Sequence, residues 1–261
     1  MRLWLAVLLL ATSASTMAAT RVVSLAPSLS EIVVELDSAD LLVGVLDGGE
    51  RPTVLKDLPS VGRYGQLDME RLLSLKPDLL LLWPGSVGPG QRAQLKALGI
   101  PIYVAEPHSL DQLITQIQDI ATQLGRPERG VQRAAQLGAR LEALRQRYRR
   151  DMLVPVFYQV WDRPLYTVGG GQIISDALAV CGAHNVFADL DLPAPQVSVE
   201  SVLQRQPQMI LATDQAQLDA WKTWPVAQGR LLLVNDKGLE RPSGQMIEAT
   251  ARLCELIAPD R

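Results

Sequence analysis

The sequence predicts an α/β protein of two Rossmann-like lobes, each with a mainly parallel sheet, joined by one long helix. Short, wholly apolar segments alternate with amphipathic segments in both halves, a helical stretch separates the halves, and one segment of the first half recurs in the second. The chain has 261 residues, 48% of them hydrophobic and 20% charged, which is enough for two hydrophobic cores. Its 28 acidic residues outnumber the 25 lysines and arginines, so we expect no nucleic acid as a partner.

Residues 1–19 have the order of a secretory signal peptide. Arg2 precedes an apolar run from Leu3 to Ala11, and small and hydroxylated residues follow. The run is too short to span a bilayer. We therefore expect export and removal of this segment after Ala18 or Ala19.

The two cysteines are interpreted in the light of export. In an oxidising compartment, Cys181 and Cys254 are expected to form one disulfide, which closes a loop of more than seventy residues and contributes about 4 kcal/mol to stability. The alternative is a pair of unpaired, buried thiols. A zinc site is less favoured because His108 and His184 are the only histidines, and we expect no bound metal.

The first lobe is expected over residues 20–126. Its buried strands are predicted at Val22–Leu25, Val43–Val45, Leu79–Leu82 and Ile102–Val104. Helix starts are predicted at a capping box of Ser28 and Glu31, at Asp68 and at Ser109. Alternation of strand and helix predicts a mainly parallel sheet covered by helices.

Residues 127–150 are predicted to form the connecting helix. Pro127 suits a first-turn position, and the apolar residues that follow have helical spacing. A rod of this length, about 36 Å, can cross one lobe and reach another. Glu128, Glu142 and Asp151 dilute its arginines and the whole chain is acidic, so we interpret the arginines as a solvated helix face and not as a DNA-reading surface.

The second lobe is expected over residues 151–261. Its strands are predicted at Leu153–Tyr158, Met209–Ala212 and Leu231–Val234, and its helices at Ile173–Cys181, Val199–Arg205 and Ser243–Ile257. The segment Glu70–Leu81 aligns without gaps on Glu200–Leu211, which lies 130 residues later. Each copy is a short helix that begins with glutamate, a proline break and a buried strand, so the lobes are two versions of one unit.

A ligand site is expected in a cleft between the lobes. Ligands of open parallel sheets bind beyond the carboxyl ends of the strands. Aromatic residues concentrate there or in adjoining loops, namely Trp83, Trp161, Tyr64 and Tyr166. Such a set suits a broad, partly apolar ligand held by ring contacts.

Several motifs resemble the periplasmic iron-complex and vitamin B12-binding proteins of ABC importers. In the first half these are Arg21–Ser28 with Glu31, Leu42–Val45, Met69–Arg71, Leu75–Leu79 and Leu98–Pro101. The B12 branch is resembled in the second half, through Pro195–Ser198 with Glu200 and through Glu240–Arg241 with Ser243 ahead of a helix that carries Cys254.

The resemblance implies a periplasmic protein that captures cobalamin or a related corrinoid as transported ligand, not as cofactor, and delivers it to a membrane permease, without catalysis. We expect it to act as a monomer. Of the family's ligand-contacting rings, Trp83 matches, Tyr64 replaces a tryptophan and Tyr166 a phenylalanine. Gly48 stands in the place of a tyrosine and Ala194 in the place of a tryptophan, for which Trp161 or His108 could compensate. Polar contacts are expected from Asp236, Lys237, Gly238, Leu239, Glu240 and Arg241.

Glu70 and Glu200 match the family's docking glutamates, one on each lobe, which engage arginines of the two permease subunits. Their equivalent places in the internal repeat agree, because two lobes would then present one charge each to a two-fold partner. The alternative is a local role at a helix start, where an acidic residue is favourable by itself.

Other functions remain as alternatives. Arg51, Arg63, Arg163 and Arg241 keep an iron-siderophore or haem carrier open, and His108 could ligate a metal centre carried by the ligand. A secreted α/β hydrolase is disfavoured because Pro84–Gly88, the nearest candidate for a nucleophile elbow, has proline where the first glycine belongs.

Overall fold

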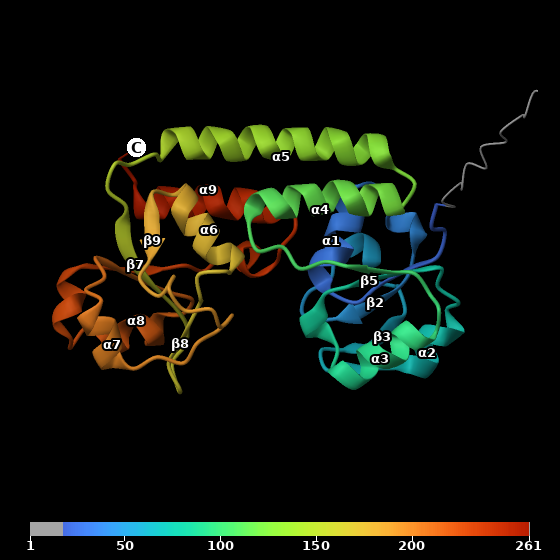
Figure 1. Ribbon diagram of the computed structural model, residues 1–261, viewed down its shortest axis with the longest axis horizontal. Coiled ribbons are helices and arrows are strands. Elements are labelled where there is room, and N and C mark those ends of the chain that lie inside the picture. The colour runs from blue at the N-terminus through green and yellow to red at the C-terminus, as the bar shows by residue number, and fades with distance from the viewer. Residues whose placement is uncertain (1–17, 261) are drawn as a thin grey trace, which may run out of the picture.

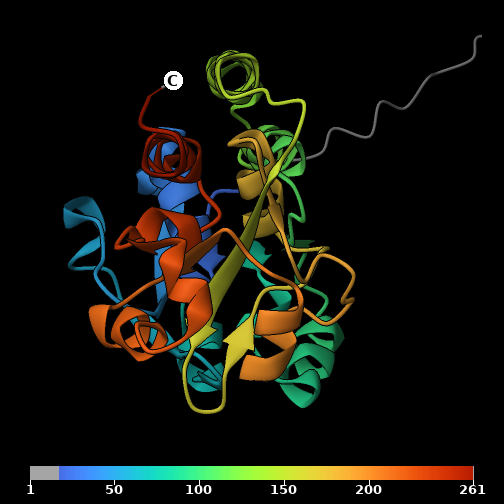
Figure 2. The same ribbon diagram turned by 90° about the vertical axis from the view of Figure 1, so that its left-hand side faces the viewer.

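The computed structural model describes residues 18–260, and residues 1–17 of the expected signal peptide lie outside this range. Two lobes lie side by side below the long helix α5 (Pro127–Arg147), which runs across the top of both in Figure 1. Figure 2 looks along this helix and shows it stacked above the lobes. The predicted α/β class with two parallel-rich lobes and one long helix is confirmed.

The N-terminal lobe is a sheet of strand order β4-β3-β2-β1-β5-β6, parallel except for the β3–β4 hairpin. Its strands are β1 (Val22–Ser24), β2 (Leu42–Asp47), β3 (Ser60–Arg63), β4 (Gln66–Leu67), β5 (Leu79–Leu82) and β6 (Ile102–Val104). Its helices are α1 (Pro27–Glu35), α2 (Met69–Ser74), α3 (Pro89–Ala97) and α4 (Leu110–Gln123). The hairpin was not expected from the sequence, because its strands are too short to show a period.

Two of the three predicted helix starts are confirmed. The side chains of Asp68 and Ser109 each accept a hydrogen bond from a backbone N–H three residues on. The capping box of Ser28 and Glu31 is wrong. Helix α1 begins at Pro27, whose missing N–H and fixed φ suit the first turn, so Ser28 already lies inside the helix.

The C-terminal lobe is a sheet of strand order β11-β10-β7-β8, with β9 paired to β7. Its strands are β7 (Val154–Trp161), β8 (Tyr166–Thr167), β9 (Ala183–Asn185), β10 (Met209–Ala212) and β11 (Arg230–Leu233). Its helices are α6 (Ile173–Val180), α7 (Val199–Gln204), α8 (Gln215–Trp221) and α9 (Gln245–Ile257). Helix α9 contacts α5 and, through the residues at its start, α1 of the N-terminal lobe.

The internal repeat is confirmed at the level of single residues. Helices α2 and α7 and strands β5 and β10 occupy equivalent positions in the two lobes. Lys76 and Gln206, the residues before the two prolines, both have a φ of 48°. A residue in the left-handed conformation therefore follows the short helix at the equivalent position of each copy.

Helix α5 is bound to both lobes. Its buried face includes Leu137, Leu141 and Leu144, which belong to one hydrophobic cluster with residues of α1, α4, α6 and α9. Arg133 forms an ion pair with Glu35 of the N-terminal lobe, and Arg140 with Glu248 of the C-terminal lobe. The arginines of the expected solvated face stay partly exposed, and two of them, Arg140 and Arg145, also link α5 to Glu248 and Asp111.

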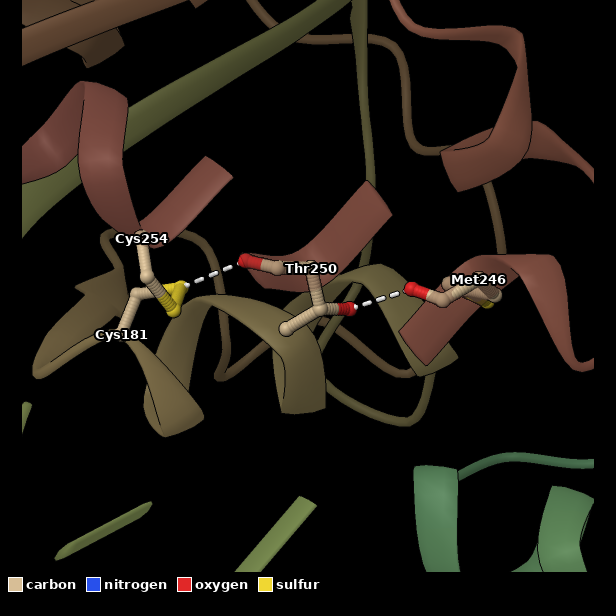
Figure 3. Close-up of a disulfide and its surroundings, with 4 residues drawn as sticks. All are labelled: Cys181, Met246, Thr250 and Cys254. Carbon is tan, nitrogen blue, oxygen red and sulfur yellow. Dashed lines mark hydrogen bonds between the residues drawn. A yellow bond between two sulfur atoms is a disulfide. The ribbon is translucent and has the colours of Figure 1, made fainter. Parts of the chain in front are cut away.

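The predicted disulfide between Cys181 and Cys254 is present and joins the end of α6 to α9 (Figure 3). The Thr250 hydroxyl beside it donates to the Met246 carbonyl at 2.8 Å. Both sulfurs are buried in the core of the C-terminal lobe. Among residues 18–260, no helix is both long and apolar enough to cross a membrane.

Candidate ligand-binding site

Tyr64 and Trp83 come together at the carboxyl edge of the N-terminal sheet. Tyr64 follows β3 and Trp83 follows β5, and both strands run parallel to the strands between them. Their ring centroids are 5.4 Å apart with an interplanar angle of 53°. Two rings that are distant in sequence thus form one aromatic platform, as expected for a site beyond the strand ends.

Backbone hydrogen bonds fix this platform. Tyr64 and Gly65 form the two-residue tip of the β3–β4 hairpin, where Gly65 has a φ of +70°. The Gly65 N–H donates to the Ser86 carbonyl at 3.1 Å. The Ser86 hydroxyl in turn donates to the Trp83 carbonyl at 2.6 Å. The hairpin tip is therefore tied to the turn that carries Trp83.

The Tyr64 ring is half in contact with protein and half open, with 46% of the residue exposed. Burial of the remainder raises the pKa of its hydroxyl to about 12. Tyr64 is therefore a neutral phenol over the physiological range. It offers a flat apolar face and one hydroxyl to a ligand.

In the C-terminal lobe, Trp161 and Tyr166 are cross-strand partners at the end of the β7–β8 hairpin. Trp161 is 58% exposed and Tyr166 is half-buried. Tyr166 also bridges to Gln196, which places the segment that holds Ala194 beside it. The predicted aromatic residues thus form one pair in each lobe.

Hydrogen bonds to Asp236 fix the loop at residues 236–241. Asp236 accepts hydrogen bonds from the Gly238 N–H at 3.0 Å and from Arg252 at 2.6 Å. The bond from Arg252 holds the pKa of Asp236 below its usual value. Lys237 and Glu240 lie in the short helix that follows, and Leu239 is buried in the core. The backbone and the polar residues of this loop are what it can offer to a ligand.

Arg241, at the end of this loop, contacts the opposite lobe. Its guanidinium donates to the Glu31 carboxylate at 2.8 Å, and the Ser243 hydroxyl donates to the other Glu31 oxygen at 3.0 Å. A Cβ added to Gly49 would lie 2.7 Å from the same guanidinium. Sequence reasoning missed Glu31 in this role, although a glutamate among the apolar residues of α1 was the available signal.

A second carboxylate of α1 reaches the same junction. Glu35 accepts from the Gly244 N–H at 3.1 Å and from Arg133 at 3.2 Å. Burial raises the pKa of Glu35, and Arg133 and the backbone N–H groups of Gly244 and Gln245 only partly offset it. Both α1 carboxylates therefore hold the start of α9 from the other lobe.

Gly48 lines a small depression at the end of β2, together with Pro27, Arg51 and Leu55. A Cβ at Gly48 would lie 2.6 Å from the Pro27 ring, so the backbone approaches α1 too closely for a side chain. Beside it, Asp47 accepts from Arg51 and from Ser60. Burial alone would raise the pKa of Asp47, but these two hydrogen bonds outweigh it and lower the pKa.

The predicted basic residues are engaged with other protein groups. Within the N-terminal lobe, Arg51 pairs with Asp47 and Arg63 donates to Gln66 at 2.8 Å, while Arg241 pairs across the lobes with Glu31. Arg163 is exposed next to Asp162. The set therefore does not form a concentrated positive lining.

His108 bridges the lobes. Its Nδ1 lies 2.9 Å from the Gly171 carbonyl oxygen. Two residues on, the Leu110 N–H donates to Asp176 at 2.8 Å, so this strand-to-helix loop is tied to the start of α6. Within the described residues, no cluster of histidine, cysteine and acidic side chains has the arrangement of a metal site.

Glu70 and Glu200 are both exposed in the first turns of α2 and α7. These helices lie at the outer ends of the lobes, away from α5 (Figure 1). Each lobe therefore presents one glutamate on the side opposite to the connecting helix.

Comparison with known proteins agrees with this architecture. A vitamin B12-binding protein of Yersinia pestis is 35% identical over 244 residues, which cover 92% of this chain and 87% of the relative. The periplasmic vitamin B12 binding protein BtuF of Vibrio cholerae has a similar structure, with a TM-score of 0.81 and 31% identity over 93% of this chain and 99% of that one. The periplasmic heme-binding protein RhuT of Roseiflexus sp. RS-1 gives a TM-score of 0.77 with 25% identity, over 93% and 99% of the two chains.

Residues 22–230 match the family described as periplasmic binding protein. The match extends over both lobes and the helix between them. The expected periplasmic localisation is confirmed, and the relatives give no support to the hydrolase alternative. This chain belongs to the periplasmic binding protein family.

Proposed function

We propose that this protein binds cobalamin or a related corrinoid between its lobes and delivers it to an ABC importer, without a chemical step and as a monomer. The observation that carries the proposal is the platform of Tyr64 and Trp83 at the carboxyl edge of the N-terminal sheet. Flat, neutral rings suit a broad and partly apolar macrocycle. The similarity to vitamin B12-binding proteins over nine-tenths of the chain supports the same ligand.

The remaining proposed contacts come from the other lobe. Trp161 and Tyr166 offer the second pair of rings, and the polar groups of the loop at residues 236–241 offer hydrogen bonds. Gly48 has no side chain to offer, and the Pro27 ring fills the place where its Cβ would lie. The corrinoid is transported ligand in this proposal, and it is not a cofactor.

A calorimetric titration of the protein without residues 1–19 tests the ligand. We expect saturable 1:1 binding of cyanocobalamin and none of haem or of a ferric siderophore. Haem is the meaningful competitor because of the structural similarity to a heme-binding protein. Saturable binding of haem without binding of cyanocobalamin would overturn the assignment.

For delivery, we propose that Glu70 and Glu200 dock on arginines of the two-fold permease. Matched first-turn positions in the internal repeat and exposure of both side chains support this pairing. Glu70→Lys combined with Glu200→Lys is expected to abolish uptake while cobalamin binding is unchanged. Glu128→Lys is the matched control, since Glu128 is an exposed first-turn glutamate of α5. Unchanged uptake in the double variant would remove the docking role.

A further inference from the structure

Gly85 lies directly against the indole of Trp83. A Cβ added to Gly85 would lie 2.5 Å from Cη2, 2.6 Å from Cζ3 and 2.9 Å from Cζ2 of that ring. These three carbons form the outer edge of the six-membered ring. Because carbon atoms in contact are normally about 3.5–4.0 Å apart, no side chain fits at Gly85 while the indole keeps this position.

The backbone at this position does not require glycine. Gly85 is the middle residue of the 3-10 helix η3 (Pro84–Ser86), and it is not among the glycines of residues 18–260 that have positive φ. An alanine would adopt the same backbone conformation without strain. Glycine is therefore needed at this position to leave room for the indole, and not to form the turn.

The turn cannot easily move away to make room. The Ser86 N–H and hydroxyl both donate to the Trp83 carbonyl, at 3.0 and 2.6 Å. The Ser86 carbonyl accepts from the Gly65 N–H of the hairpin that carries Tyr64. Ser86 is completely buried. When a methyl group is added at Gly85, the part that moves is therefore the indole ring.

We propose that Gly85 is a positioning residue that sets the orientation of the Trp83 ring against Tyr64 and thereby the shape of the ligand platform. The ring orientation is a property of the free protein. The effect on corrinoid affinity rests on the proposed function. The two parts are tested separately.

The free protein is tested by ¹⁹F NMR after incorporation of 5-fluorotryptophan, with the Trp83 resonance assigned by its loss in Trp83→Phe. Gly85→Ala is expected to shift this resonance and to leave the other tryptophan resonances in place. Gly88→Ala is the matched control, because a Cβ at Gly88 meets nothing within 4 Å and its φ of −67° suits alanine. An unshifted Trp83 resonance in Gly85→Ala would overturn the proposal.

Affinity for cyanocobalamin is then measured in the same variants. Gly85→Ala is expected to weaken binding about tenfold, of the order of one lost ring contact, and Gly88→Ala to leave it unchanged. In the background of Trp83→Phe, whose shorter ring lacks the clashing edge, Gly85→Ala is expected to have no further effect. A full effect of Gly85→Ala in that background would overturn the positioning role.

Two controls separate the possible failures. Wild-type protein that does not bind cyanocobalamin contradicts the proposed function, while the ¹⁹F measurement still decides the role of Gly85. If Gly85→Ala alone unfolds, the double variant with Trp83→Phe is expected to recover the wild-type melting temperature. A double variant that remains unfolded would assign Gly85 to the turn and contradict the inference.

Discussion

Glu31 of the N-terminal lobe and Arg241 of the C-terminal lobe form an ion pair of 2.8 Å, with the Glu31 side chain only 5% exposed. Arg241 ends the loop that is proposed to contact the ligand, and Glu31 is a buried residue of α1. One contact therefore sets both the relative position of the lobes and the position of the ligand loop. The Ser243 hydroxyl on the second Glu31 oxygen completes the junction.

Removal of Arg241 leaves Glu31 buried without its cationic partner. We expect Arg241→Ala to lower the free energy of unfolding by about 3 kcal/mol, at the lower end for a buried pair because the Arg241 side chain is 25% exposed. Urea unfolding of both proteins without ligand measures this loss in the free energy of unfolding. Lys222→Ala, which breaks an exposed pair with Asp219, is the control and is expected to cost less than about 1 kcal/mol. Equal losses in the two variants would contradict the buried character of the junction.

Glu35 is expected to give the stability a pH dependence of unusual sign. Because burial raises its pKa in the folded state above 4.5, its contribution is fully present below about pH 4.5 and is lost as the pH rises through the raised pKa. The stability of wild type relative to Glu35→Gln should therefore fall as the pH rises from about 4.5 through the raised pKa of Glu35. Urea unfolding of both proteins at each pH measures this difference. A difference that grows with pH would show that the ion pair with Arg133 outweighs burial.

The disulfide between Cys181 and Cys254 closes a long loop, with a sequence separation of 73 residues. Its loss by Cys181→Ala with Cys254→Ala is expected to lower the free energy of unfolding by about 4 kcal/mol through the entropy of the unfolded chain. Urea unfolding with and without a thiol reductant provides the control. The reductant should bring wild type to the level of the double variant and leave the variant unchanged. A wild type as stable in reductant as without it would contradict a stabilising role.

The two missing aromatic positions are expected to respond differently when the rings are restored. Ala194 is exposed, so Ala194→Trp should fit and tighten cyanocobalamin binding by about tenfold. Gly48→Tyr should neither fit nor tighten binding, since even a Cβ at Gly48 would lie 2.6 Å from the Pro27 ring. Calorimetry of both variants, with melting temperatures to detect strain, tests this pair. Equal gains in the two variants would show that Pro27 yields readily.

Much of the fold could be predicted from the sequence because it depends on local patterns. The buried strands β5 and β10 are visible in the sequence as apolar runs that each follow a proline of the internal repeat. The aromatic platform was predicted as a set of residues, but not as a contact, because the hairpin that carries Tyr64 has only two residues in β4. Glu31 was misassigned to a helix cap because its partners, Arg241 and Ser243, are more than two hundred residues away in sequence. Contacts of that range follow from the packing of the lobes and leave no local signal.

Helix α5 is attached to both lobes, to Glu35 through Arg133 and to Glu248 through Arg140, and its apolar face is continuous with the cores of both lobes. A splint fastened in this way resists bending. The two lobes are therefore expected to keep nearly the same separation with and without ligand. Release of the ligand would then depend on a partner protein that separates the lobes. Small-angle scattering of the protein with and without ligand should give nearly superimposable curves.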